Sequence, residues 1–147
     1  MDKARLTKIF YFETAHALFG YDGKCKNIHG HSYKFHVTIE GNAIEDNANP
    51  KNGMVLDFGI LKSIVNEEII NEIDHAILLN ANSPHKNLGE KLMEENHKVI
   101  LVNYQPTCEN MIIDFRNRIQ AKLPAHVNLV RLVLYETETS YCEWIAK

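Results

Sequence analysis

The chain has 147 residues, 45% of them hydrophobic, with 16 Lys and Arg against 19 Asp and Glu and a net charge of −3. Domains usually contain roughly 100–200 residues, so we expect one domain over residues 1–147. The acidic balance argues against a nucleic-acid partner bound through a broad basic surface. No apolar run approaches the roughly 20 residues of a membrane span, so no membrane partner is expected.

The cysteine and histidine residues indicate the cellular compartment and supply candidate ligands. The three cysteines, Cys25, Cys108 and Cys142, lie far apart in the sequence. An odd number of dispersed cysteines argues against a disulfide framework and favours a reducing, cytoplasmic location. The N-terminal residues lead into an alternating pattern without the apolar core of a signal peptide. The eight histidines stand out, and only their positions in the fold can separate ligands and bases from surface residues.

The first third of the chain alternates between apolar and polar residues. Residues 5–14 and 33–41 show a period of two and many aromatic or β-branched side chains, which predicts two strands. Residues 42–53 are rich in Asn, Asp, Gly and Pro and predict a polar loop. Asp57 is a suitable N-cap for a helix whose apolar stripe ends near Ile73.

The second half predicts one more long helix, a short one and three more strands. Residues 80–97 are polar, with a short helix as the only expected element, and residues 98–103 form an apolar run typical of a strand. A second helix opens at Pro106 and Thr107 and is stopped by Pro124. Residues 127–137 and 141–146 predict the last two strands. The order of elements predicts an α+β fold with a mostly antiparallel sheet and helices on one face.

The most informative local pattern is His29-Gly30-His31. Two histidines at i and i+2 of an extended segment point to the same side, so both imidazoles can reach one metal ion. Imidazole ligands suit Zn²⁺, and a catalytic zinc ion keeps three protein ligands and one open position. His16, just after the first predicted strand, is the best third ligand if the two strands pair. His36, inside the second strand, is the alternative.

Cys25 precedes the histidine pair and admits two functional interpretations. It can be a fourth ligand that closes a structural His₃Cys site, or a nucleophile or base beside an open zinc ion. The positive charges of Lys24 and Lys26 favour the thiolate form needed for either role. A buried, inert cysteine fits Cys108 and Cys142 better.

Three carboxylates are further candidates. Asp74 lies next to His75 at the exit of the first helix, where a carboxylate can orient an imidazole for acid–base work; alternatively, His75 satisfies carbonyls at the helix end. Glu136 ends an apolar strand, where it can accept hydrogen bonds from a guanidine-like heterocycle edge or stay a surface residue. Glu109, in the first turn of the second helix, has a structural explanation in the helix dipole.

These pieces, in this order, resemble the 6-pyruvoyl-tetrahydropterin synthase family, which includes the 6-carboxytetrahydropterin synthases of queuosine biosynthesis. The resemblance extends over nearly the whole chain. The matching segments are residues 12–16 (FETAH), 25–33 (CKNIHGHSY), 53–58 (GMVLDF), 73–80 (IDHAILLN), 106–110 (PTCEN) and 135–137 (YET).

The resemblance implies a fold and an assembly. The family has the tunnelling fold, a four-stranded antiparallel sheet with two helices on one face. Its subunits join their sheets into a barrel, and trimers stack into hexamers. The pocket lies between subunits, so the resemblance implies a homo-oligomer.

The resemblance also implies a site for 7,8-dihydroneopterin triphosphate. Zinc would be held by three ligands, protons would be moved by three catalytic residues, and the pterin ring would be bound by three more. The implied zinc ligands are His16, His29 and His31, the catalytic residues are Cys25, Asp74 and His75, and the substrate-binding residues are Glu136, Glu109 and Thr107.

The family divides by product. One branch eliminates triphosphate to form 6-pyruvoyl-tetrahydropterin, and the other also cleaves the side chain to give 6-carboxy-5,6,7,8-tetrahydropterin and acetaldehyde. The three residues between Cys25 and His29 match the carboxy branch, which is therefore the expected activity. Residues 82–104 are longer than a compact member of that branch needs, and we expect them at the pocket mouth or at a subunit contact.

Overall fold

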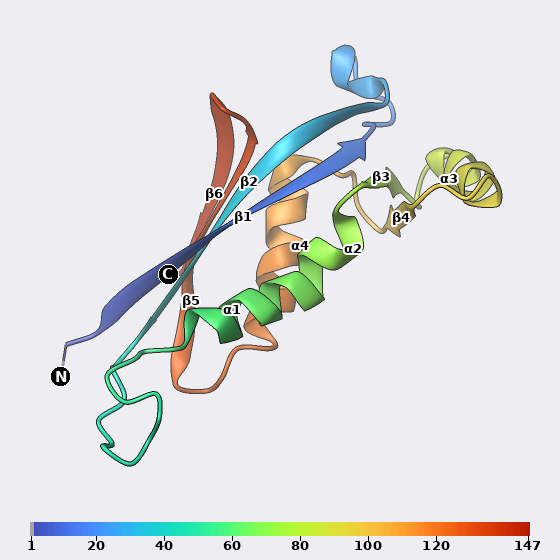
Figure 1. The fold of residues 1–147 in the computed structure, drawn as a ribbon. Coiled ribbons are helices and arrows are strands. Elements are labelled where there is room, and N and C mark those ends of the chain that lie inside the picture. The colour runs from blue at the N-terminus through green and yellow to red at the C-terminus, as the bar shows by residue number, and fades with distance from the viewer. Residues whose placement is uncertain (1) are drawn as a thin grey trace.

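The computed structural model describes residues 2–147 as a six-stranded sheet with helices packed against it (Figure 1). The elements in chain order are β1 (Ala4–His16), η1 (Lys24–Lys26), β2 (His29–Gly41), α1 (Phe58–Val65), η2 (Asn66–Ile70), α2 (Asn71–Ile73), β3 (Ala76–Asn80), α3 (His85–Glu94), β4 (Val99–Val102), α4 (Cys108–Gln120), β5 (Val127–Thr137) and β6 (Ser140–Ile145).

The sheet has the strand order β4-β3-β1-β2-β5-β6. The four antiparallel strands β1, β2, β5 and β6 confirm the predicted core of the fold. The strand predicted over residues 98–103 is β4, whereas β3 was not predicted. Together β3 and β4 extend the four-stranded sheet that the resemblance implied, in parallel beside the end of β1. Both long strands also reach further than predicted, so that β1 includes His16 and β2 starts at His29.

The missed strand, β3, is buried on both faces. Leu78 belongs to the main core, whereas Ile77 and Leu79 pack into a second, smaller cluster with Val99 of β4. Parallel strands covered on both faces have no alternation of apolar and polar residues, so a period of two could not reveal this one. The cover on the second face is α3, which supplies the partly buried Leu88 and Leu92.

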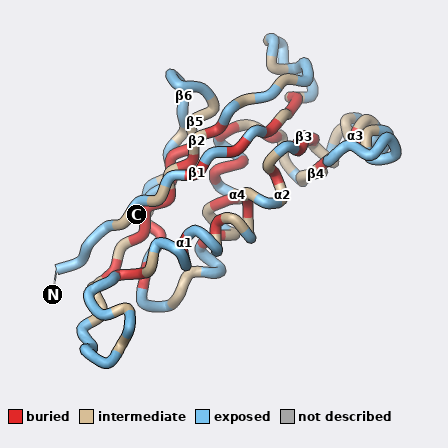
Figure 2. Tube along the Cα trace, in the orientation of Figure 1, coloured by how far each residue is buried: buried red, intermediate tan, exposed pale blue. Residues whose placement is uncertain are grey.

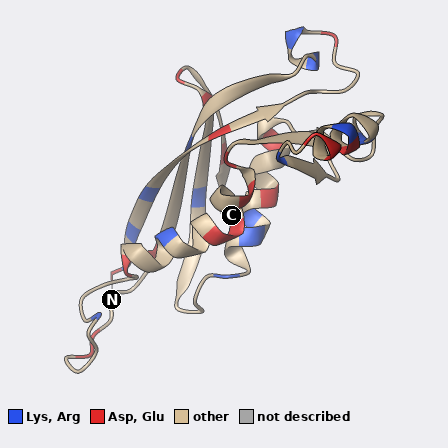
Figure 3. Cartoon of the chain, turned by 45° about the vertical axis from the view of Figure 1, so that its right-hand side comes forward, with Lys and Arg blue, Asp and Glu red and all other residues tan. Residues whose placement is uncertain are grey.

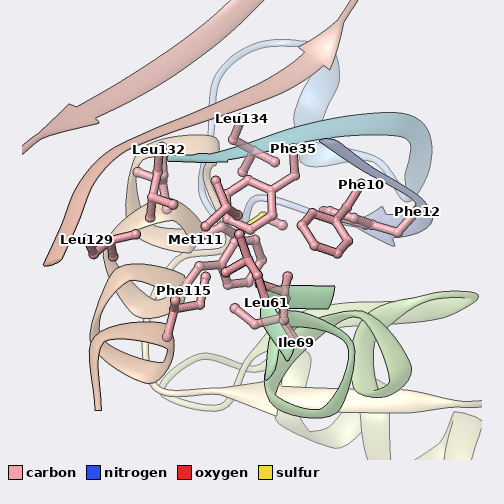
Figure 4. Close-up of a cluster of buried hydrophobic side chains, with 14 of the residues drawn as sticks. Phe10, Phe12, Phe35, Leu61, Ile69, Met111, Phe115, Leu129, Leu132 and Leu134 are labelled. Carbon is pink, nitrogen blue, oxygen red and sulfur yellow. The ribbon is translucent and has the colours of Figure 1, made fainter. Parts of the chain in front are cut away.

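The main core lies between the antiparallel strands and the helices α1, α2 and α4 (Figure 2). Phe12 of β1 stacks on Tyr33 of β2 at a centroid distance of 4.9 Å and meets the edge of Phe115 from α4. Figure 4 shows side chains of the sheet pointing into the same cluster as Leu61, Ile69 and Met111 from the helices. Burial of this apolar surface holds the helices on one face of the long strands.

The helices begin where their caps predict. The Asp57 side chain accepts a hydrogen bond of 2.7 Å from the Gly59 N–H at the start of α1. The helical run then passes through the π-helical turn η2 and ends with α2 at Ile73, as expected. Thr107 caps α4 by accepting from the Asn110 N–H. None of the helices in residues 2–147 is long and apolar enough to cross a membrane.

Charged residues of both signs lie on the helices, as Figure 3 shows, and α4 alone carries Glu109, Asp114, Arg116 and Arg118. Basic residues also mark η1, at the end of the sheet, where Lys24 and Lys26 flank Cys25. Short α3 carries both signs as well. This mixed distribution agrees with the modest net charge of the chain.

Candidate metal centre and active site

The register of β1 and β2 brings three histidines to one end of the sheet. His16, the last residue of β1, pairs with His29, the first residue of β2, and Thr14 pairs with His31. All three imidazoles lie on the face that carries the helices, because side chains alternate along each strand. Their ring centroids are 4.5 to 5.2 Å apart.

A fourth polar group completes this cluster. The carboxylate of Glu136, near the end of β5, lies 2.8 Å from His31 Nε2 and 3.6 Å from His16 Nε2. One ligand atom from each of the four residues lies within 4.8 Å of all the others, which is close enough to hold one metal ion. The structure thus places Glu136 beside the histidines and not on a solvated strand end.

The hydrogen bonds around two rings point their Nε2 lone pairs at each other. His16 Nδ1 lies 2.7 Å from the Pro106 carbonyl, and His29 Nδ1 lies 2.7 Å from the Asn27 carbonyl. A carbonyl oxygen only accepts, so each Nδ1 carries the proton and each neutral ring leaves Nε2 bare. The two Nε2 atoms are 3.0 Å apart. A cation bound by both atoms would resolve this contact, and carbonyl partners on Nδ1 are a usual outer support of metal-bound histidines.

Burial favours the neutral, ligating form of the rings. Burial lowers the pKa of His16 below its usual value, against the raising effect of its hydrogen bond to Pro106 and of Glu136. Burial likewise lowers the pKa of His31, with the Glu136 charge acting in the opposite direction. The three imidazoles form a donor set that suits a catalytic Zn²⁺ site with one open position.

Neither sequence alternative joins this cluster. His36 lies five residues after His31 on β2 and therefore on the opposite face, where its ring is 5.7 Å from that of Tyr135. Cys25 lies half-buried in η1, and its thiol is not among the ligand atoms gathered within 4.8 Å. The geometry favours His16 as third ligand and gives no support to a closed His₃Cys site.

The Asp74–His75 pair sits just past the end of α2, as an ion pair of 3.0 Å between Asp74 Oδ2 and His75 Nδ1. The other carboxylate oxygen, Oδ1, accepts from the Glu13 N–H at 2.9 Å. This backbone hydrogen bond, assisted by His75, holds the pKa of the Asp74 carboxyl below its usual value. An ionised carboxylate on Nδ1 leaves the exposed Nε2 of His75 available for proton transfer.

One pocket of about 530 Å³ is lined by one residue of each group. It lies at the end of β1 and β2 beside β3, and both His31 and His75 line it. Its volume is in the range of small-molecule sites. Segment 82–104 contributes Leu92, His97 and Lys98 to the wall, in agreement with the expected place of this segment at the pocket mouth.

The remaining candidates have structural roles that account for their positions. Thr107 uses its hydroxyl to cap α4, and Glu109 is exposed in the first turn of that helix. The thiol of Cys108 lies 2.9 Å from that of Cys142, and all three cysteines are free. The contact with Cys142 and burial raise the pKa of Cys108, so this thiol stays protonated. Substrate contacts of Thr107 and Glu109 stay predictions.

Sequence reasoning missed the groups that support the site from the backbone. The carbonyls of Pro106 and Asn27 orient the histidine rings, and the backbone of Glu13 holds the Asp74–His75 turn. Such contacts carry no sequence signal, because almost every residue has the same backbone groups.

Comparisons with known proteins show which family the chain belongs to. The profile of the family described as 6-pyruvoyl tetrahydropterin synthase matches residues 5–146. The 6-carboxy-5,6,7,8-tetrahydropterin synthase of Haemophilus influenzae is 37% identical over 141 residues, which cover 95% of this chain and 97% of that protein. The enzyme of the same name from Rickettsia typhi is 32% identical over 144 residues, 95% of this chain and 98% of its own.

A solved structure shows the same fold. The 6-pyruvoyl tetrahydropterin synthase of Plasmodium vivax superposes with a TM-score of 0.75 at 18% identity, over 98% of each chain. The tunnelling fold expected from the sequence is therefore confirmed. From a family match over nearly its whole length, and from relatives that align end to end, we conclude that this chain belongs to the 6-pyruvoyl tetrahydropterin synthase family.

Proposed function

We propose that this protein is a zinc-dependent lyase that converts 7,8-dihydroneopterin triphosphate and water into 6-carboxy-5,6,7,8-tetrahydropterin, acetaldehyde and triphosphate. Relatives with 32 and 37% identity carry the name of this activity. The observation that carries the proposal is the pocket that His31 of the histidine cluster and His75 of the acid–base pair line together.

His16, His29 and His31 are the proposed zinc ligands. When bound, Zn²⁺ would polarise the side-chain oxygens of the substrate and acidify the neighbouring C–H bond. Backbone carbonyls that bind Nδ1 hold the rings of His16 and His29 for this task. Glu136 is the proposed anchor of the pterin ring, since a carboxylate accepts two N–H bonds from a guanidine-like edge.

Proton transfer is assigned to Cys25 and to the Asp74–His75 pair. As a thiolate, Cys25 would accept the proton from carbon. His75, oriented through Nδ1 by Asp74, returns a proton from the pocket side. Thr107 and Glu109, at the start of α4, are proposed to assist Glu136 in binding the ring.

We further propose that the protein works as a homo-oligomer, trimers stacking into hexamers, with each pocket completed by a neighbouring subunit. The half-buried Cys25 does not line the 530 Å³ pocket of its own chain. A second copy can supply the thiol to a pocket that already holds His31 and His75.

The test is product analysis after incubation of the zinc-loaded protein with 7,8-dihydroneopterin triphosphate. We expect acetaldehyde and 6-carboxytetrahydropterin in equal amounts, together with triphosphate. The variant His29→Asn should lose both the metal and the products. His126→Gln, a histidine change outside the cluster, should keep them. Triphosphate without acetaldehyde would assign the pyruvoyl reaction instead, and no triphosphate at all would refute a lyase.

A further inference from the structure

The backbone of His75 has a conformation that needs support. Its φ angle of 61° is in the left-handed region, which non-glycine residues rarely adopt. Such residues persist where the surrounding structure fixes them, and they gather at functional sites. The imidazole of His75 is 77% exposed, so packing of the ring does not hold the turn.

Strand β1 holds one side of this turn. The Glu13 carbonyl accepts from the His75 N–H at 2.6 Å, and the Glu13 N–H donates to Asp74 Oδ1. The buried hydroxyl of Thr14 donates to the Ile73 carbonyl at 2.8 Å. The turn is therefore tied to the strand that ends in His16.

Lys98 holds the other side of the Asp74–His75 turn. Its Nζ atom donates to the carbonyls of Asn71 and Asp74, each at 2.9 Å. These carbonyls belong to the end of α2, where a cation is favoured by the helix dipole. The backbone of Lys98 is itself fixed, because its carbonyl accepts from the Ile77 N–H of β3 at 3.0 Å. Lys98 belongs to the long segment 82–104 and also lines the pocket.

We propose that Lys98 is a positioning residue, which holds the Asp74–His75 turn in place by crosslinking the end of α2 to the start of β4. Segment 82–104 thereby contributes to the reaction, because the ammonium group of its Lys98 binds the carbonyl of Asp74, the residue that orients His75. The inference rests on the proposed function, since it assigns to Lys98 the alignment of the proposed proton donor.

The first test is the variant Lys98→Met, which keeps the length of the side chain without its three donors. A misplaced catalytic group loses rate steeply with distance, so we expect kcat to fall about tenfold while KM stays within about twofold. Lys98→Arg, whose guanidinium can also reach two carbonyls, should restore most of the rate. Lys86→Met on exposed α3 is the matched control and should leave kcat unchanged. Zinc content and the urea midpoint are measured for each variant.

The second test separates positioning from a general loss of structure. In a His75→Ala background the group to be positioned is gone, so Lys98→Met should cause no further loss of the residual rate. An equal fold-loss in both backgrounds would show a merely structural role and overturn the inference. An unchanged kcat in Lys98→Met would overturn it as well. If the wild-type protein makes no product, the proposed function fails, and that outcome is visible in the same assay.

Discussion

His75, whose side chain is proposed for catalysis, has a left-handed backbone conformation that glycine would adopt without strain. The left-handed conformation costs an L-residue roughly 1–2 kcal/mol. We therefore expect the free energy of unfolding to be about 1 kcal/mol larger for His75→Gly than for His75→Ala. Both variants should lose turnover. Urea denaturation measures the difference. Asn96, with a φ of 68° at the end of α3, is the control: its Gly and Ala variants should differ in stability in the same way without losing turnover. Equal stability of His75→Gly and His75→Ala would show that the left-handed conformation of His75 is not strained.

Cys25 is the proposed base and not a ligand, and a single variant separates these roles. Cys25→Ala should keep one zinc ion per chain and lose turnover by about 10²–10⁴-fold, the usual contribution of acid–base catalysis. Metal analysis beside the product assay makes the distinction. Cys142→Ala, a cysteine change away from the cluster, should keep both the metal and the rate. Loss of zinc from Cys25→Ala would revive the closed His₃Cys site.

His36 gives the chain an acid-sensitive position outside the metal cluster. Burial, together with the charges of Lys34 and Arg131, lowers its pKa below the ordinary value of 6.5. On acidification the imidazole of His36 is protonated in the unfolded chain before it is protonated in the folded one. The contribution of His36 to the free energy of unfolding therefore falls as the pH drops below about 6.5.

Urea unfolding of the wild type and of His36→Gln between pH 7.5 and pH 5 tests this sign. The wild type should lose more stability over the range than the variant does, because the other histidines are common to both. His97→Gln, which removes an exposed histidine, should follow the wild type. A variant that loses as much stability as the wild type would show that His36 does not contribute.

Many residues of the candidate site could be predicted from the sequence. His16, His29 and His31 were predicted together because strand alternation puts i and i+2 on one side, and because paired strands meet at their ends. The place of Glu136 beside His31 depends on the register of β2 with β5, which no local pattern reveals. The support from Pro106 and Asn27 comes from backbone atoms, whose contacts depend on the folded path of the chain.

Among the elements, the antiparallel strands and both long helices followed from periodicity and caps. Strand β3 did not, because it is buried on both faces, and its cover α3 carries only a weak apolar stripe. Asp74 and His75 lie between α2 and this strand. The unpredicted parallel extension of the sheet is therefore what fixes the second half of the site.

Gly89 sets how closely α3 approaches the extension. A Cβ atom at Gly89 would lie 2.8 Å from Leu101 Cδ2 and 3.3 Å from Val99 Cγ1. Gly89→Val should push α3 away from β4 and lower the unfolding free energy by about 2 kcal/mol, as overpacking does. Asn87→Val places the same side chain on the exposed side of α3 and should cost much less. Similar losses in both variants would argue against close packing at Gly89.

For the whole molecule, the open edges of the sheet predict how copies assemble. Strand β6 is one edge, and β1 pairs with β3 only over Thr14–His16, so its earlier residues face no strand on that side. Exposed strand edges are templates for pairing with another chain. The proposed barrel uses them by joining β6 of one subunit to β1 of the next.

Proline at Glu143 tests this pairing. The Ala146 N–H donates to Val130 on β5, so by alternation the N–H of Glu143 points away from β5. Glu143→Pro should therefore reduce the molar mass in solution toward the 16.9 kDa of one chain, as light scattering would show. Glu143→Ala loses the ion pair with Arg131 but keeps the N–H, and should stay assembled. Full assembly of the proline variant would exclude β6 as the joining edge.

If a histidine-bound zinc ion and the pocket beside it perform one reaction, product formation must depend on the metal. A chelator removes the metal, and Zn²⁺ is titrated back while acetaldehyde formation from 7,8-dihydroneopterin triphosphate is followed. We predict no product from the metal-free protein, and a rate that rises in proportion to added zinc until one ion is bound per chain. Product formation that is unaffected by removal of the metal, or one zinc ion bound per chain without any product, would contradict the account.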